Sequence, residues 1–167
     1  LDKYLGSVKD ALDAGIKPRC HFEDITRADF YGFVIPFASE LMKLSKESGK
    51  VLISGTITDN YGVLRRSAVI ADKGKLLGIS DMRLSVNDNG YQGGGAQRVY
   101  QTQVGRIGLL VGDDILDIDG IKAMSLCDAD FIIALMSGEE KPQYNFLIRS
   151  YSYLFGVPIV LINSNTV

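Results

Sequence analysis

The sequence predicts a mixed α/β fold of layered sheets with helices on their outer faces. Two observations support this prediction. The middle of the chain alternates short apolar runs with glycine-containing turns, which is typical of β-hairpins. The last third alternates helical patterns with apolar strands, which indicates α/β crossovers. Hairpins combined with crossovers suit two or more layers around one core, and 167 residues amount to one domain, 1–167.

The first third of the chain is expected to form two helices and two strands. Residues 1–15 place apolar side chains at helical spacing and end at a glycine, which predicts a helix. Residues 17–25 indicate a short strand. Pro36 can begin a second helix, because proline is tolerated in the first helical turn, and this helix is expected to end near Gly49. Residues 51–57 then predict a buried strand.

Two hairpins follow, separated by a loop rich in glycine and asparagine over residues 85–97. Their turns contain Gly74 and Gly105, and glycine readily adopts the positive φ that tight hairpin turns require. The four strands of these hairpins are expected over residues 67–71, 75–79, 98–102 and 106–111.

The end of the chain is expected to alternate helix and strand. Residues 114–127 predict a helix with aspartate in its first turn, where a negative charge is favourable against the helix dipole. Residues 131–136 predict a buried strand, residues 142–154 a helix that begins with proline, and residues 158–162 a last strand. The complete predicted order is helix, strand, helix, five strands, helix, strand, helix, strand.

Composition excludes several classes of function. The formal charge is −2 and no basic stripe is present, so binding to nucleic acid is not expected. No apolar run reaches the roughly 20 residues that a membrane helix needs. Cys20 and Cys127 lie far apart and are expected to be reduced, which indicates a cytoplasmic protein. His21 is the only histidine, so no multi-histidine metal site is possible, and neither a metal nor a cofactor is expected.

Four segments within residues 50–167 resemble, in the correct order, the carbon–nitrogen hydrolase (nitrilase) superfamily. The resemblance implies an α-β-β-α sandwich. Compared with that family the chain is expected to be truncated at both ends, since an opening strand and the strands after Asn163 are not found. Uncovered strand edges and apolar faces would then favour a homo-oligomer. The matching segments are residues 67–78, 104–114, 123–133 and 151–163.

The family's chemistry uses a cysteine that attacks an amide or nitrile carbon, a glutamate that transfers protons and a lysine that stabilises the developing charge. By this resemblance the cysteine position falls on Gly112, which has no side chain with which to attack. The glutamate position falls on Glu23 or Asp24.

The lysine position lies just after Gly78, and residues 79–84 contain no lysine. Arg83 is the only cation of that segment, whereas Asp81 or Met82 is the closer match in position. The resemblance therefore assigns a residue to only one of the three catalytic roles, that of the glutamate.

Simpler structural roles compete with functional ones at several positions. Gly112 is most simply a turn residue that tolerates unusual dihedral angles. Asp113 and Asp114 are more typical of helix caps than of catalytic carboxylates. Cys127 precedes a buried strand and is expected to be a small buried filler. Residues 93–95 are three glycines without a following Gly-Lys-Ser/Thr, so we expect a flexible loop rather than a phosphate-binding loop.

The N-terminus shows a second resemblance. Residues 1–49, most clearly 17–37, are similar to a segment of the Re-type citrate synthases, which are TIM-barrel condensing enzymes. That family needs a divalent metal held by a later pair of histidines, and His21 is the only histidine here. A working condensing enzyme is therefore not expected. Whether residues 1–49 are native to the domain, and whether the similarity reflects a chimera, a fusion or chance, stays open at this point.

Three functions follow from these observations. The first is a non-catalytic binding or interaction domain, whose vestigial pocket would hold a small amide, amine or carboxylate. The second is an active amide hydrolase with a substitute nucleophile. The third is a structural assembly without a ligand. The expected pocket residues are Glu23, Asp24, Arg83, Gly112 and Asp113.

Overall fold

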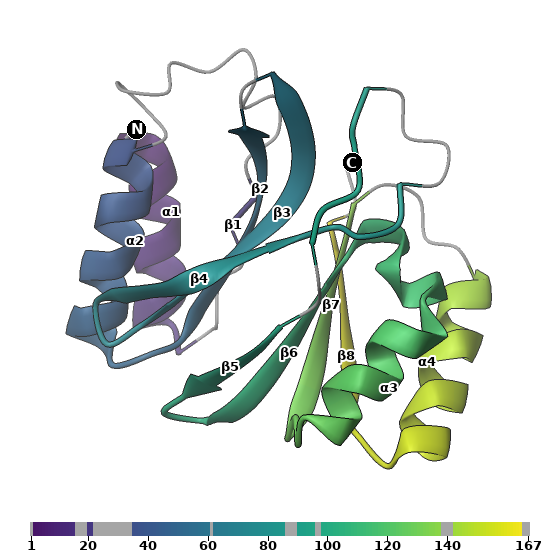
Figure 1. Ribbon diagram of the computed structural model, residues 1–167. Coiled ribbons are helices and arrows are strands. Elements are labelled where there is room, and N and C mark those ends of the chain that lie inside the picture. The colour runs from purple at the N-terminus through teal and green to yellow at the C-terminus, as the bar shows by residue number, and fades with distance from the viewer. Residues whose placement is uncertain are drawn as a thin grey trace. The chain divides into compact units, whose positions relative to one another are not determined.

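The computed structural model describes residues 2–15, 20–21, 35–60, 62–85, 90–95, 98–137 and 142–164. Its helices and strands follow one another in the predicted order, with one short 3₁₀ helix, η2, added between β6 and α3. The described strands form two sheets of four strands, in the orders β1-β2-β3-β4 and β5-β6-β7-β8 (Figure 1). The chain divides into two compact units, Leu1–Ile57 with Val69–Ile79, and Thr58–Ala68 with Ser80–Val167.

The first sheet and its helices comprise α1 (Asp2–Asp13), β1 (Cys20–His21), α2 (Ile35–Ser48), β2 (Leu52–Asn60), β3 (Val63–Asp72) and β4 (Lys75–Asp81). The two helices pack side by side, and Val8, Leu41 and Leu44 are buried. β1 runs parallel to β2, with Cys20 opposite Ser54. The strand expected over residues 17–25 is therefore described only at its centre.

The first predicted hairpin is confirmed at the turn between β3 and β4. Lys73 and Gly74 both have positive φ, 50° and 78°, which is the backbone that a two-residue hairpin turn requires. Both strands are longer than the apolar runs that predicted them, because β3 already begins at Val63 and β4 continues to Asp81. The additional residues are partly polar, and hydropathy alone could not assign them.

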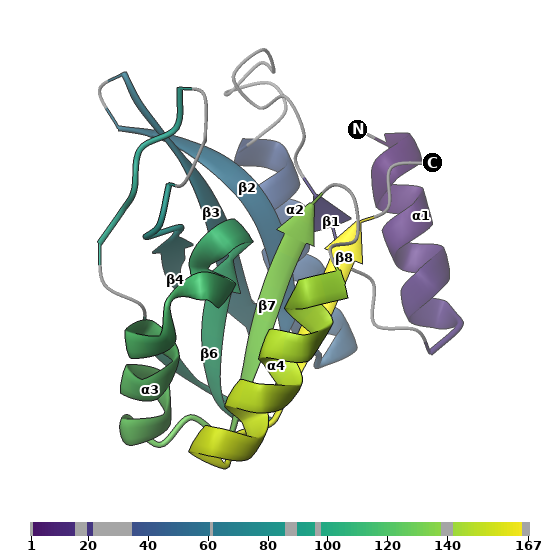
Figure 2. The ribbon, with the colours of Figure 1, turned by 90° about the vertical axis from the view of Figure 1, so that its right-hand side faces the viewer.

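The second sheet and its helices comprise β5 (Val99–Thr102), β6 (Gly105–Val111), η2 (Gly112–Leu116), α3 (Ile118–Leu126), β7 (Phe131–Ser137), α4 (Pro142–Phe155) and β8 (Ile159–Ser164). β5 and β6 form the second predicted hairpin, and β6, β7 and β8 run parallel. The helices α3 and α4 lie on the same face of this sheet (Figure 2). This is expected, because crossovers between successive parallel strands are right-handed.

The core beside the second sheet lies between that sheet and the helices α3 and α4. One buried cluster joins β6, β7 and α3, and a second joins η2, β7 and α4. Gly108 allows α3 to approach, because a Cβ at this position would lie 2.6 Å from the Sδ atom of Met124. The first cluster contains Leu110, Ile121, Met124, Ile132, Ala134 and Val157, and the second Ile115, Met136, Tyr144 and Ile148.

The prediction of a single helix over residues 114–127 is wrong in one respect. The chain first forms η2, and α3 begins only at Ile118. Asp117 separates the two with φ −88° and ψ 85°, while its amide donates to the carbonyl of Asp114 at 3.0 Å. Its carboxylate binds Arg83, a residue far away in sequence. Helical periodicity gives no information about such a contact, so the break could not be predicted.

Candidate functional site

The turn after β6 stands at the carboxyl end of a parallel strand, where open α/β sheets place their functional sites. Gly112 begins this turn with φ +58°, a conformation that disfavours any residue with a side chain. A Cβ on Gly112 would lie 2.7 Å from the Sδ atom of Met82. The position that resembles the family's nucleophile is therefore a glycine with a methionine packed against it.

Met82 follows β4, and two hydrogen bonds of its backbone hold it in place. Its amide donates to the carbonyl of Arg66 at 2.7 Å, and its own carbonyl accepts from the amide of Gly94 at 2.7 Å. Only 1% of Met82 is exposed. Of the two residues that could match the family's lysine, Met82 is thus the one whose side chain lies against Gly112.

Asp81 belongs to a different cluster of polar side chains. The hydroxyl of Ser67 donates to Asp81 Oδ1 at 2.7 Å and lies 2.8 Å from the hydroxyl of Thr58. Arg65 forms an ion pair with Asp81 Oδ2 at 3.5 Å. The carboxylate of Asp81 on β4 therefore binds two residues of β3, and one of them, Ser67, also contacts Thr58 on β2.

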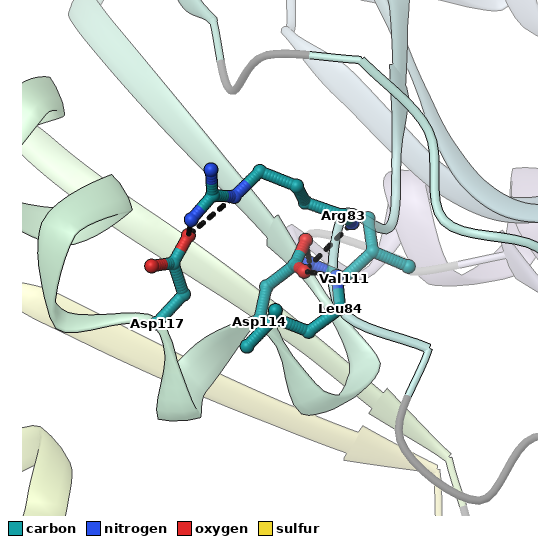
Figure 3. A network of polar contacts seen from close by, with 5 residues as sticks. All are labelled: Arg83, Leu84, Val111, Asp114 and Asp117. Carbon is teal, nitrogen blue, oxygen red and sulfur yellow. Dashed lines mark hydrogen bonds and ion pairs between the residues drawn. The ribbon is translucent and has the colours of Figure 1, made fainter.

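The cation of Arg83 is engaged by a carboxylate. Its Nε and Nη2 atoms both lie 2.7 Å from Asp117 Oδ2 (Figure 3). The hydrogen bond and the negative charge of Asp117 raise the pKa of the Arg83 guanidinium above its ordinary value. Arg83 is exposed, whereas Asp117 is buried. The positive charge of Arg83 is consequently directed towards the carboxylate of Asp117.

Asp114 was expected to cap a helix, and its carboxylate also accepts hydrogen bonds from a segment distant in sequence. Its Oδ2 atom accepts from the amide of Val111 at 3.4 Å, as a residue near a helix start can. Its Oδ1 atom accepts two shorter hydrogen bonds, from the amides of Arg83 at 2.7 Å and Leu84 at 2.9 Å (Figure 3). Burial raises the pKa of the Asp114 carboxyl to about 6, although these three amides act in the opposite direction. No sequence pattern identified this residue as more than a cap.

Asp113 is half-buried and accepts a hydrogen bond at 2.8 Å from the hydroxyl of Tyr144, a buried residue of α4. The structure thus places three of the five expected pocket residues, Arg83, Gly112 and Asp113, around one turn. The other two, Glu23 and Asp24, lie outside the described residues.

The glycine-rich loop is packed against the segment after β4. A Cβ on Gly93 would lie well inside 3.0 Å of the Arg83 carbonyl oxygen, and one on Gly94 equally close to the Cβ of Asp81. Gly95 has open space around it. Close approach to the backbone of Arg83 and to the side chain of Asp81 therefore explains two of the three glycines.

Cys127 corrects another expectation. It follows the last turn of α3 and is exposed, whereas the sequence predicted a buried filler. Asp128, the next residue, has φ +56° and turns the chain away from the helix.

Across the part of the chain that the structure describes, no group of three or more histidine, cysteine, aspartate or glutamate side chains could hold a metal ion. Within that same part, no helix is long and apolar enough to cross a membrane.

Comparison with solved structures settles the fold. A carbon–nitrogen hydrolase from Helicobacter pylori superposes with a TM-score of 0.75 and 16% identity, over 97% of this chain and 67% of that one. An amidase of the nitrilase superfamily from Nesterenkonia superposes with a TM-score of 0.78 and 14% identity, over 97% and 70% of the two chains. This chain has the fold of the carbon–nitrogen hydrolases.

The same fold forms part of a larger enzyme. A glutamine-dependent NAD⁺ synthetase from Acinetobacter baumannii superposes on 98% of this chain but only 34% of its own length, with a TM-score of 0.73 and 19% identity. The predicted α-β-β-α class of the carbon–nitrogen hydrolase fold is thus confirmed. No protein-family model matches the sequence.

The second resemblance is also confirmed. A citrate (Re)-synthase from Syntrophus aciditrophicus is 65% identical over 66 residues, which are 38% of this chain and 10% of that protein. A citrate (Re)-synthase from Clostridium kluyveri is 67% identical over 48 residues, 29% of this chain and 11% of that protein. The match therefore spans about a tenth of the length of these curated relatives.

Proposed function

We propose that this chain is a non-catalytic binding domain built on the carbon–nitrogen hydrolase fold. The observation that supports this most directly is the pairing of Gly112 with Met82 at the turn where the fold would present a nucleophile. Covalent catalysis needs a side chain that attacks and is later released, and glycine has none. Arg83, the remaining cation of the neighbouring segment, is bound to Asp117 instead of being available for a developing negative charge.

The proposed ligand is a small amide or amine held near Asp113. The carboxylate of Asp113 is half-buried and oriented by Tyr144, so it can accept hydrogen bonds from N–H groups. A carboxylate ligand, the third class that the sequence left open, would need a cation. Since Arg83 is already paired with Asp117, this class is the least suited to the described residues.

The test combines turnover with thermal stability. We expect no hydrolysis of a panel of short aliphatic amides, with the Nesterenkonia amidase as positive control. Acetamide or methylamine should raise the melting temperature in a concentration-dependent manner, whereas acetate at the same ionic strength should not, because a ligand that binds only the folded state stabilises it.

Other outcomes would support the competing functions. Turnover that disappears in Cys127→Ala would identify the exposed thiol as a substitute nucleophile and establish the amide hydrolase. Neither turnover nor stabilisation by any of the three compounds would favour a structural assembly without a ligand.

We further propose that the chain self-associates through α4. Three large apolar side chains of this helix are exposed, Phe146 at 71%, Tyr153 at 92% and Leu154 at 63%. Phe146 and Tyr153 are seven residues apart, which places them on one face of the helix. Among the described strands β8 pairs only with β7, and Ile159–Ser164 contains no charge that would disfavour pairing with another chain.

Light scattering should therefore show a dimer or larger species at micromolar concentration, and Tyr153→Arg should shift it towards the monomer. Leu76→Arg is the matched control, because Leu76 is a similarly exposed apolar residue on β4, away from this helix in sequence. A strict monomer at high concentration, or equal effects of the two substitutions, would contradict the proposal.

A further inference from the structure

The strand β8 has the sequence of an interior strand but lies at the edge of its sheet. Ile159–Ser164 begins with four consecutive apolar residues, a pattern typical of parallel strands that are buried on both faces. Among the described strands, however, β8 pairs only with β7 (Figure 2). Val160 is 47% exposed, and Ile159, Leu161 and Ile162 are each partly exposed. This edge therefore carries apolar surface that the described strands leave uncovered.

Two other edge strands of the described sheets, β4 and β5, are protected against pairing with a second chain. β4 has a charged residue at each end, Lys75 and Asp81, and β5 is only four residues long. Charge and short length are two of the means by which edge strands avoid unwanted pairing. β8 has neither, because its six residues include no charge and no proline. Of these three edges, β8 is therefore the one suited to accept another strand.

The register of β8 identifies the backbone groups that would make this contact. The amide of Ile132 on β7 donates to the carbonyl of Pro158 at 2.8 Å, and Ile132 lies opposite Ile159. Backbone groups of successive residues in a strand point to alternate sides, so those of Val160 also face β7. The amides and carbonyls of Ile159 and Leu161 consequently face the open edge.

We propose that two copies of this chain pair antiparallel through β8 and form one continuous sheet across a two-fold axis. An axis at Val160 places Ile159 opposite Leu161 of the second copy, so that each such pair exchanges two backbone hydrogen bonds. Val160 then meets its own counterpart across the axis. Apolar side chains contact apolar ones at these positions, and no charge of β8 has to be removed from water.

A second copy fits this edge better than an unrelated segment for two reasons. The central residues of β8 are complementary to themselves, as a two-fold interface requires. β8 also packs against α4, whose exposed Phe146, Tyr153 and Leu154 add area to that of a single pair of strands, and stable interfaces bury roughly 1,200–2,000 Å². The inference thus rests on the self-association proposed above and names β8 as its central contact.

Amide hydrogen exchange on the full chain, measured by NMR at increasing concentration, tests the pairing directly. The amides of Ile159 and Leu161 should gain protection in step with the fraction of dimer, because they then donate to the second copy. The amide of Ile132, which already donates to Pro158, is the internal reference and should change far less. Dimerisation that leaves the amides of Ile159 and Leu161 unprotected would overturn the inference.

A pair of charge variants tests the position of the axis. Val160→Lys and Val160→Glu should each lose the dimer in light scattering, since like charges would lie directly opposite each other. An equimolar mixture of the two variants should restore a dimer, because opposite charges then pair across the axis. Ile79→Lys is the matched control, since Ile79 is 40% exposed on the edge strand β4, and it should leave the dimer unchanged.

The outcomes separate this inference from the self-association on which it rests. Loss of the dimer in Tyr153→Arg but not in Val160→Lys would overturn the pairing of β8 and leave α4 as the interface. Charge variants that stay monomeric when mixed would contradict an axis at Val160. A strict monomer of the unmodified chain would contradict both proposals. If a charge variant does not fold, the exchange measurement on the unmodified chain still decides.

Discussion

Replacing Gly94 with alanine is expected to lower the free energy of unfolding by about 3 kcal/mol, at the upper end of what overpacking typically costs. The added Cβ would lie well inside 3.0 Å of the Cβ of Asp81. Asp81 cannot easily yield, because Ser67 donates to its carboxylate and Arg65 pairs with it. The shift would also strain the hydrogen bond from the amide of Gly94 to the carbonyl of Met82.

Urea unfolding followed by circular dichroism measures this loss as a lower midpoint at an unchanged slope. Gly95→Ala is the matched control, since no atom lies within 4 Å of its Cβ position and its φ is not positive. We expect the control to change stability by less than about 0.5 kcal/mol. Equal losses in the two variants would mean that the close contact with Asp81 is not what requires glycine.

Introducing a thiol by Gly112→Cys is expected to destabilise the chain without producing an amidase. A side chain at φ +58° costs about 1–2 kcal/mol, and the displacement of Met82 adds to this. Catalysis should remain absent, because Arg83, the cation of residues 79–84, is already paired with Asp117 and is not available to stabilise an oxyanion. Loss of a single oxyanion donor already lowers rates by roughly 10²–10³. Thermal melts and the amide panel described above measure the two effects.

A double-mutant cycle tests the role of Met82 in this result. Met82→Ala alone should lower the free energy of unfolding by about 2–5 kcal/mol, as truncation of a buried side chain does. In the Gly112→Cys background the same truncation should cost clearly less, because it removes the obstacle to the new side chain. Additive effects would show that Met82 does not limit what residue 112 can be. Turnover in Gly112→Cys alone would show that the missing cation is not needed.

The sequence predicted the elements well where the signals were local. The turn at Lys73–Gly74 and the helix Pro142–Phe155 lie where glycine and proline indicated, because these residues restrict the backbone directly. Prediction failed where distant residues decide the conformation. Asp117, where the expected helix breaks, binds the distant Arg83, and Cys127 lies exposed at the end of α3.

The candidate site was predictable only in part. Resemblance to the family located Gly112, Arg83 and Asp113, and the structure gathers these residues around one turn. The contact of Met82 with Gly112 and the burial of Asp114 were not foreseeable, since both involve contacts between residues 82–84 and the turn after β6, which lie far apart in sequence. Spacing along the chain gives no information about such long-range packing.

The contact between residues 82 and 112 also constrains evolution. Any mutation that adds a side chain at Gly112 is penalised by the left-handed backbone and by Met82 together. A smaller residue at position 82 would relieve the second penalty but leaves a cavity while glycine remains. Each single step is therefore unfavourable, and only the two changes together avoid the contact. A nucleophile at this turn would consequently require two substitutions, the first of which lowers the stability of the chain.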